Sequence, residues 1–195
     1  MGIYFFPQWL SFVFHDGSVD IRPVIWIICA DSITGILFLI KPDVIDRFPI
    51  VIGFLVTAYA LIKTSMCAGN KLITSWNYYD AVILGLAQAV ALLPGISRLA
   101  LTCFVGCLLG FSLLDAFCLS WMLQVPLMIL AIVKSIMSGV ERKSLGQLLN
   151  IKTCLAIIMS SGLSWIALLL VIKIIQLNWW YVFGWYMILP AIIWF

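Results

Sequence analysis

The sequence predicts an all-α, polytopic membrane helix bundle that forms a single domain over residues 1–195. Hydrophobic residues make up 65% of the chain and charged residues 10%, and the mean hydropathy is +1.18. A small soluble core cannot remove that much apolar side chain from water, so a soluble domain is excluded. The apolar residues fall into long runs between short polar segments. This pattern predicts about five spans, one re-entrant helical hairpin and a short N-terminal helix.

The N-terminal residues 1–14 are apolar but interrupted by Pro7 and Gln8, and the run is too short to cross a bilayer unaided. We expect this part to be a short interfacial helix, followed by a turn at residues 15–18. His15 is the single histidine of the sequence. No catalytic pattern surrounds it, so the favoured interpretation is a solvated loop histidine, with an acid-base role as the alternative.

The first full span is predicted over residues 23–40, with Asp31 close to its middle. An acid at membrane depth is costly unless it pairs or faces a cavity. Two interpretations stay open: Asp31 faces Arg98 or supplies an acidic function to the site, or it has no catalytic role. A short charged loop at residues 41–47 leads into a second span over residues 48–66.

Residues 78–111 hold the stretch on which the functional argument rests. Two apolar runs, residues 81–93 and 99–111, flank the sequence Pro-Gly-Ile-Ser-Arg. At a rise of about 1.5 Å per residue each run reaches only about 20 Å, against a hydrocarbon core of about 30 Å. The lengths predict a hairpin of half-helices whose turn lies at membrane depth. An ordinary loop between two tilted spans is the alternative.

The turn of this hairpin has the residues of an anion site. Pro94 and Gly95 end the first half-helix, and Ser97 is a good N-cap for the second. Backbone N–H groups and the positive end of the helix dipole then point into the cavity. Arg98 adds a permanently charged, forked donor that suits phosphate oxygens.

Two more polar side chains are placed near the turn by helical spacing. Thr102 lies one turn after Arg98, and Gln88 lies six residues before Pro94. We expect them to bring a hydroxyl and an amide to the same cavity. The alternative for Arg98 is an ion pair made purely for packing, with Asp80 or Asp115 as the partner.

The remaining chain reads as two further spans over residues 116–133 and 151–172, with a polar loop between them and a last span after the aromatic residues 178–186. Lysines and arginines concentrate in the loops 41–47 and 134–152. The positive-inside rule places these loops in the cytoplasm, so that the hairpin opens toward the periplasm or the cell exterior. The six cysteines form no metal-ligand pattern, and the dispersed net charge of +3 gives no reason to expect nucleic acid.

The string from Gly85 to Arg98, with Thr102 after it, resembles the second signature of the bacitracin-resistance type undecaprenyl-diphosphate phosphatases, PGxSRSGxT. Leu99 and Ala100 stand where that family usually has serine and glycine. The family's earlier signature, EGxTEFLPxSSxGH, does not occur in this sequence. The chain therefore resembles the last two-thirds to three-quarters of a family member.

The resemblance implies an enzyme of the bacterial inner membrane that hydrolyses undecaprenyl diphosphate to undecaprenyl phosphate and phosphate. This reaction recycles the lipid carrier of peptidoglycan synthesis and confers bacitracin resistance. A divalent cation, Mg²⁺ or Ca²⁺, is also implied, with no ligands identified in the sequence. An upstream segment or a second copy would complete the site. The expected site residues are Ser97, Arg98 and Thr102 for catalysis and Gln88, Gly95, Ser97 and Arg98 for substrate binding.

Two other functions remain open from the sequence. Broken helices whose N-termini face an anion also occur in transporters, so a lipid-phosphate or anion transporter subunit is one alternative. An inactive remnant of the phosphatase, folded but without the acids, is the other. Release of phosphate from a polyprenyl diphosphate would separate the enzyme from both.

Overall fold

The computed structural model describes residues 14–15, 18–19, 21–40, 47–137 and 151–194. It confirms an all-α architecture with one minor addition, a pair of two-residue strands. The elements are β1 (Phe14–His15), β2 (Ser18–Val19), α2 (Arg22–Ile40), α4 (Ile50–Thr64), the 3₁₀ helix η1 (Ile73–Ser75), α5 (Tyr78–Val90), α6 (Arg98–Leu108), α7 (Leu113–Met137), α9 (Ile151–Gln176) and α10 (Tyr181–Ile193).

Strands β1 and β2 pair antiparallel, with His15 opposite Ser18, and the centre of the turn predicted at residues 15–18 lies outside the described residues. The expected helix within residues 1–14 and the side chain of His15 lie outside the described residues. Helices α2 and α4 occupy the places of the first two predicted spans.

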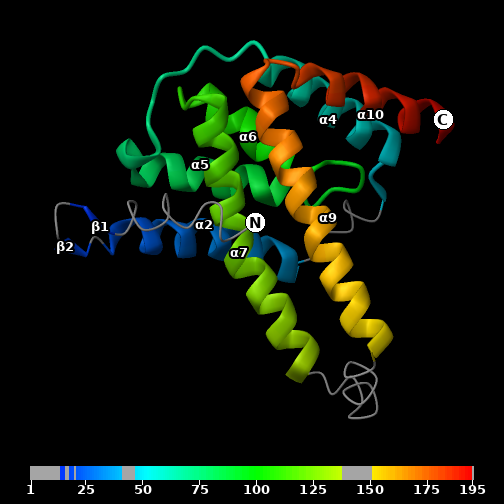
Figure 1. Ribbon diagram of the computed structural model, residues 1–195. Helices are drawn as coiled ribbons and strands as arrows, with labels where there is room; N and C mark the ends of the chain where they lie inside the picture. Colours follow the sequence, from blue (N-terminus) through cyan, green and yellow to red (C-terminus); the bar gives the residue numbers. More distant parts are fainter. Residues whose placement is uncertain (1–13, 16–17, 20, 41–46, 138–150, 195) are drawn as a thin grey trace.

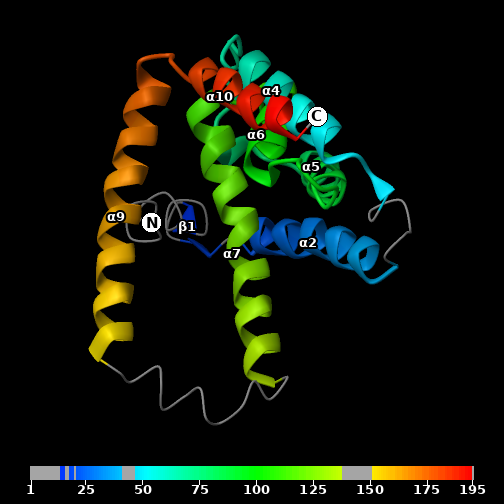
Figure 2. The ribbon, with the colours of Figure 1, turned by 90° about the vertical axis from the view of Figure 1, so that its right-hand side faces the viewer.

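Helices α7 and α9 are the two helices of the described residues that pass a test of length and apolar composition for crossing a membrane. They run side by side in Figures 1 and 2. Only 11% of the apolar window of α9 is buried, and most of its large apolar side chains are exposed, as in a helix that faces lipid. The chain is an integral membrane protein, and the number of five spans stays a prediction.

Helices α4 and α10 lie side by side in both views (Figures 1 and 2). Gly184 makes this packing close, since a Cβ atom there would be 2.9 Å from the carbonyl oxygen of Ala58. Helix α2 lies crosswise to α7 and packs on α5. At their crossing, a Cβ atom on Gly85 would be 2.8 Å from the Cα atom of Ala30. Glycine therefore sets the contact distance in both helix pairs.

The predicted hairpin is confirmed as two short helices, α5 and α6, joined by a turn (Figure 1). Both ends of the hairpin meet at Lys71. The Lys71 N–H donates to the Gly110 carbonyl at 2.9 Å, and the Lys71 carbonyl accepts from the Ser112 N–H at 3.3 Å. At 13 and 11 residues, these helices reach only about 20 and 17 Å, well short of a bilayer core.

Candidate functional site

The turn between α5 and α6 is pressed against the first turns of α4. Gly95 has φ +82°, a conformation that favours glycine, and a Cβ atom there would be 2.3 Å from the Ile50 carbonyl oxygen. On the other side of the contact, a Cβ atom on Gly53 would be 2.1 Å from the Pro94 carbonyl oxygen. Two glycines thus allow a direct backbone contact that holds the turn in place.

Thr57 of α4 fixes the turn from the same side. Its hydroxyl donates to the Gly95 carbonyl at 3.0 Å and accepts from the Ser97 N–H at 2.9 Å. The Thr57 side chain is buried, so both bonds are shielded from solvent. Neither Thr57 nor Gly53 was anticipated from the sequence. Their i, i+4 spacing on one helix is the signal that could have identified a close-packing face.

Ser97 is the N-cap of α6, as predicted. Its Oγ accepts from the Ala100 N–H at 3.4 Å. Within the described residues, the backbone N–H groups of Arg98 and Leu99 make no hydrogen bond. These are the donors at the positive end of the helix dipole, where an anion is stabilised.

Arg98 is half-buried, and its guanidinium forms no ion pair or hydrogen bond with any described residue. The two acids considered as packing partners are bonded elsewhere. Asp80 pairs with Lys71, and Asp115 accepts from the Ser112 hydroxyl. Neither of these two acids is therefore an ion-pair partner of Arg98.

Asp31 is 7% exposed, and neither of its carboxylate oxygens accepts a hydrogen bond. The amide of Gln88 is close enough to interact with it. Gln88 is itself buried, and its Oε1 accepts from the Thr34 hydroxyl at 3.0 Å. Gln88 thus lies on the α2 side of the turn, next to Asp31.

A cavity of about 300 Å³ lies beside the start of α6, among α4, α6, α7, α9 and α10. Its wall is almost entirely apolar, and its hydroxyl-bearing residues are Thr57, Ser97 and Tyr186. The lining residues are Thr57, Leu61, Ser97, Leu99, Ala100, Phe117, Trp121, Ala167, Leu168, Val171, Trp180, Phe183, Tyr186 and Met187.

Ser97 lines the cavity, whereas Gly95, Arg98, Gln88 and Thr102 are not among its lining residues. The hydroxyl of Thr102 is buried and donates to the Arg98 carbonyl at 2.8 Å. The structure therefore gives Thr102 a backbone contact, and its catalytic role stays a prediction. Gln88 accepts from the Thr34 hydroxyl of α2, and its role in substrate binding stays a prediction.

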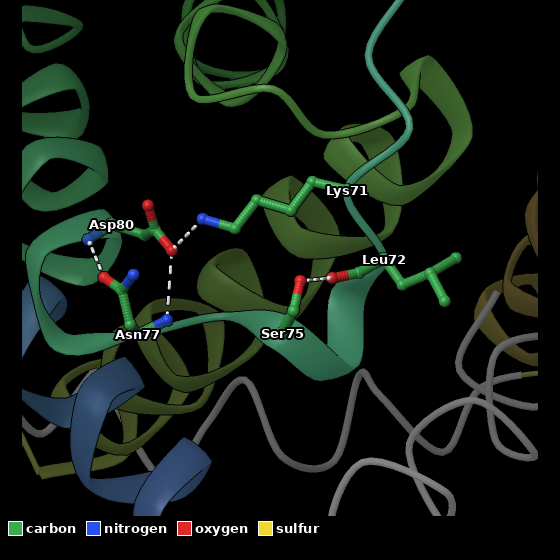
Figure 3. A network of polar contacts seen from close by, with 5 residues as sticks. All are labelled: Lys71, Leu72, Ser75, Asn77 and Asp80. Atoms are coloured by element: carbon green, nitrogen blue, oxygen red, sulfur yellow. Dashed lines mark hydrogen bonds and ion pairs between the residues drawn. The ribbon is translucent and has the colours of Figure 1, made fainter.

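The start of α5 carries the other charged cluster of the hairpin, shown in Figure 3. The Asp80 carboxylate accepts from Lys71 Nζ at 2.6 Å and from the Asn77 N–H at 3.0 Å. The Asn77 side chain accepts in turn from the Asp80 N–H at 3.0 Å, which completes a capping box. Lys71 Nζ also lies 4.5 Å from the centre of the Phe111 ring. Every charge here has a partner.

Comparisons with known proteins point to one family. The family model of the bacitracin resistance protein BacA matches residues 3–193. Undecaprenyl-diphosphatase 2 of Bacillus thuringiensis (strain Al Hakam) is 33% identical over 125 residues, 60% of this chain and 46% of the relative. Undecaprenyl-diphosphatase of Elusimicrobium minutum (strain Pei191) is 30% identical over 135 residues, 64% of this chain and 52% of the relative. The chain spans about half the length of these relatives. No solved structure matches it significantly.

Proposed function

Because this chain belongs to the family of the bacitracin resistance protein BacA, we propose that it acts on a polyprenyl diphosphate at the start of α6. The relatives named above are undecaprenyl-diphosphatases, so the proposed reaction is hydrolysis of undecaprenyl diphosphate to undecaprenyl phosphate and phosphate. The reaction would return the lipid carrier to peptidoglycan synthesis and remove the target of bacitracin.

One observation carries this proposal: cationic and N–H donors that have no partner among the described residues lie beside an apolar cavity. The donors are the Arg98 guanidinium and the first N–H groups of α6. The cavity shares its wall with the same helix start through Ser97 and Leu99. A diphosphate joined to a long hydrocarbon chain has the matching chemistry. Its headgroup fits the donors, and its first prenyl units fit the apolar wall.

In the proposed reaction, the oxygen of a water molecule bonds to the terminal phosphorus while the bond from that phosphorus to the bridging oxygen breaks. Arg98 and the α6 N–H groups stabilise the charge on the transferring phosphoryl group. We assign Ser97 the role of donor to a phosphate oxygen. Its own oxygen already accepts the Ala100 N–H, and no described carboxylate is bonded to it as a base.

A divalent cation, when bound, would neutralise part of the diphosphate charge. The described residues contain no group of three or more His, Cys, Asp or Glu side chains that could hold a metal ion by themselves. Such an ion would therefore depend on oxygens of the substrate together with a single carboxylate of this chain. Further acids from a second copy or an upstream segment would complete the site.

We place the protein in the bacterial inner membrane, with the hairpin opening toward the periplasm or the exterior. The loop charges counted in the sequence support this orientation. This orientation is tested by introducing single cysteines at Leu72 and Asn178. Their accessibility is measured from each side of the spheroplast membrane.

The function is tested with the purified protein in lipid nanodiscs, by measuring phosphate release from undecaprenyl diphosphate. Binding is followed in parallel through tryptophan fluorescence, because Trp121 and Trp180 line the cavity. We expect saturable binding and phosphate release. Saturable transfer of intact undecaprenyl phosphate across proteoliposomes, without phosphate release, would instead establish the transporter. Binding with neither activity would identify a remnant.

A further inference from the structure

We propose that the apolar cavity opens sideways toward the lipid between α9 and α10, and that the hydrocarbon chain of a bound polyprenyl diphosphate leaves the protein through this opening. The opening lies at Ala167 of α9 and Tyr186 of α10. The inference rests on the proposed function, since it assigns a path to the chain of the lipid whose headgroup is held at the start of α6. Neither residue belongs to the anion site, so the proposed reaction itself gives them no role.

The walls of the cavity differ in how far they are exposed. The side formed by α4, α6 and α7 is closed, because its lining residues are buried or half-buried. Thr57, Ala100 and Phe117 on this side are 1%, 2% and 2% exposed. Of the described residues that line the cavity, only Ala167 and Tyr186 are exposed, and the side chain of Tyr186 is 63% exposed. The cavity is therefore open on the side of α9 and α10.

The opening faces a surface that suits lipid. Helices α9 and α10 follow one another in the chain and diverge from their short connection (Figures 1 and 2). Leu163 and Leu170 lie on the same face of α9 as Ala167, one turn before and one turn after it, and both are exposed. Leu189, one turn after Tyr186 on α10, is exposed as well. Exposed apolar side chains thus border the opening on both helices, as expected of a surface in contact with acyl chains.

The size of the cavity requires an exit for a long chain. An apolar protein cavity of about 150 Å³ is large enough to bind benzene, which has six carbon atoms. At the same density, the cavity of about 300 Å³ holds about twelve carbon atoms, or about two isoprene units. An undecaprenyl chain is several times longer. Its remaining units must lie outside the cavity, and the bilayer receives them without any transfer of apolar surface into water.

The position of the anion donors identifies the occupant. Ser97 and Leu99 belong both to the cavity wall and to the start of α6, where Arg98 and the first N–H groups lie. A headgroup bound to these donors places the first carbons of its chain in the cavity. The positive charge at this end favours an anionic lipid over a neutral one. The path of the chain therefore runs from the start of α6, through the cavity, to the opening between α9 and α10.

The test uses the purified protein in lipid nanodiscs and two diphosphonates that cannot be hydrolysed. One carries an undecaprenyl chain and the other a geranyl chain, which is short enough to fit inside the cavity. Binding is followed by the fluorescence of Trp121 and Trp180 in the cavity wall. Ala167→Phe narrows the opening without adding a tryptophan. Ala156→Phe is the matched control, because Ala156 is also exposed on α9 but does not line the cavity.

We expect Ala167→Phe to raise the dissociation constant of the undecaprenyl compound about tenfold, the effect of about two methylene groups losing their contacts. The geranyl compound should bind within about twofold of wild type, since its chain does not pass the opening, and Ala156→Phe should bind both compounds as wild type does. Equal undecaprenyl affinity in Ala167→Phe and wild type would overturn the proposal. Equal losses for the two compounds would overturn it too, because the chain would then not be sensed at an exit.

A rescue separates a narrowed opening from a damaged fold. Ala167→Phe and Tyr186→Ala are combined in one protein, so that the second change widens what the first has narrowed. We expect the double variant to recover most of the undecaprenyl affinity and all variants to melt near the wild-type temperature, because both positions are exposed. A double variant that binds the undecaprenyl compound no better than Ala167→Phe would refute an opening shared by the two residues.

The same measurements distinguish this inference from the proposed function. Wild-type protein that binds neither diphosphonate would refute both. A loss in Ala167→Phe that is confined to the undecaprenyl compound would sustain the opening even if the wild type released no phosphate from undecaprenyl diphosphate. Phosphate release by the wild type, with undecaprenyl affinity unchanged in Ala167→Phe, would sustain the phosphatase and refute the opening.

Discussion

Charged groups lie near both ends of helix α5, but those near its start are bonded to one another and those beyond its end are not. At its start, Lys71, Asn77 and Asp80 bond to one another and close a capping box (Figure 3). Beyond its end, the turn leaves the Arg98 guanidinium and the first N–H groups of α6 without partners among the described residues.

The difference indicates which charges serve the fold. A charge in a membrane protein is tolerated when it is paired or when it faces a ligand. The Lys71–Asp80 pair joins the two ends of the hairpin, and the energy of its bonds goes into stability. The donors at the Arg98 turn are not bonded to described residues, so they can form hydrogen bonds to a ligand. Changes at the two clusters should therefore alter different measurements.

The largest expected effect is from Arg98→Ala. We expect phosphate release to fall by about 100-fold or more, because charge stabilisation of the phosphoryl group is lost. Thermal stability should change little, since the guanidinium makes no ion pair or hydrogen bond with the residues that the structure describes. The comparison variant Arg98→Lys keeps the charge but loses the forked geometry and should recover only part of the rate. Unchanged turnover in Arg98→Ala would remove this residue from the mechanism.

Next in size is Gly53→Ala, which pushes a methyl group against the Pro94 carbonyl. The 2.1 Å approach forces the turn away from α4. We expect a drop in phosphate release of about tenfold and a lower melting temperature. Gly35→Ala is the matched control, because a Cβ atom there meets nothing within 4 Å. That control should gain up to about 1 kcal/mol from helix propensity. Similar behaviour of the two variants would contradict the contact.

Thr57→Val should have a smaller effect on activity, of about fivefold. It leaves the Gly95 carbonyl and the Ser97 N–H without their partner, at a cost of about 1–3 kcal/mol for each buried group. Thr64→Val is the control on the same helix, since the buried Thr64 hydroxyl bonds only to the Ala60 carbonyl of its own helix. Chemical denaturation and phosphate release measure both variants. A larger loss in Thr64→Val would show that the turn does not depend on Thr57.

The smallest effect on activity is expected from Lys71→Met. It removes the partner of Asp80, so the protein should be less stable by about 1–3 kcal/mol. Diphosphate binding per folded molecule should change less than twofold, because the cluster lies at the far end of α5 from the turn. Fluorescence titration of the folded fraction gives this value. A loss of affinity as large as that of Arg98→Ala would erase the distinction between the two ends of the helix.

Much of the site followed from local sequence. The short apolar runs on either side of the Pro-Gly-Ile-Ser-Arg turn indicated half-helices, and Ser97 was correctly identified as a cap. The partner of Asp80 was not anticipated, because Lys71 is nine residues earlier in an irregular segment. The spacing of Gln88 from the turn also gave no indication that its Oε1 accepts from the Thr34 hydroxyl of α2. Sequence spacing fixes the face of a helix, whereas the neighbour of that face depends on the fold.

The sequence by itself determined that this is an all-α membrane protein with a broken, cationic hairpin, because hydropathy, run length and capping are properties of adjacent residues. Only the tertiary structure decided that α4 holds the turn through Gly53 and Thr57, and that an apolar cavity adjoins Ser97. These features join residues far apart in the chain, and backbone contacts between helices, which no local pattern encodes, bring them together.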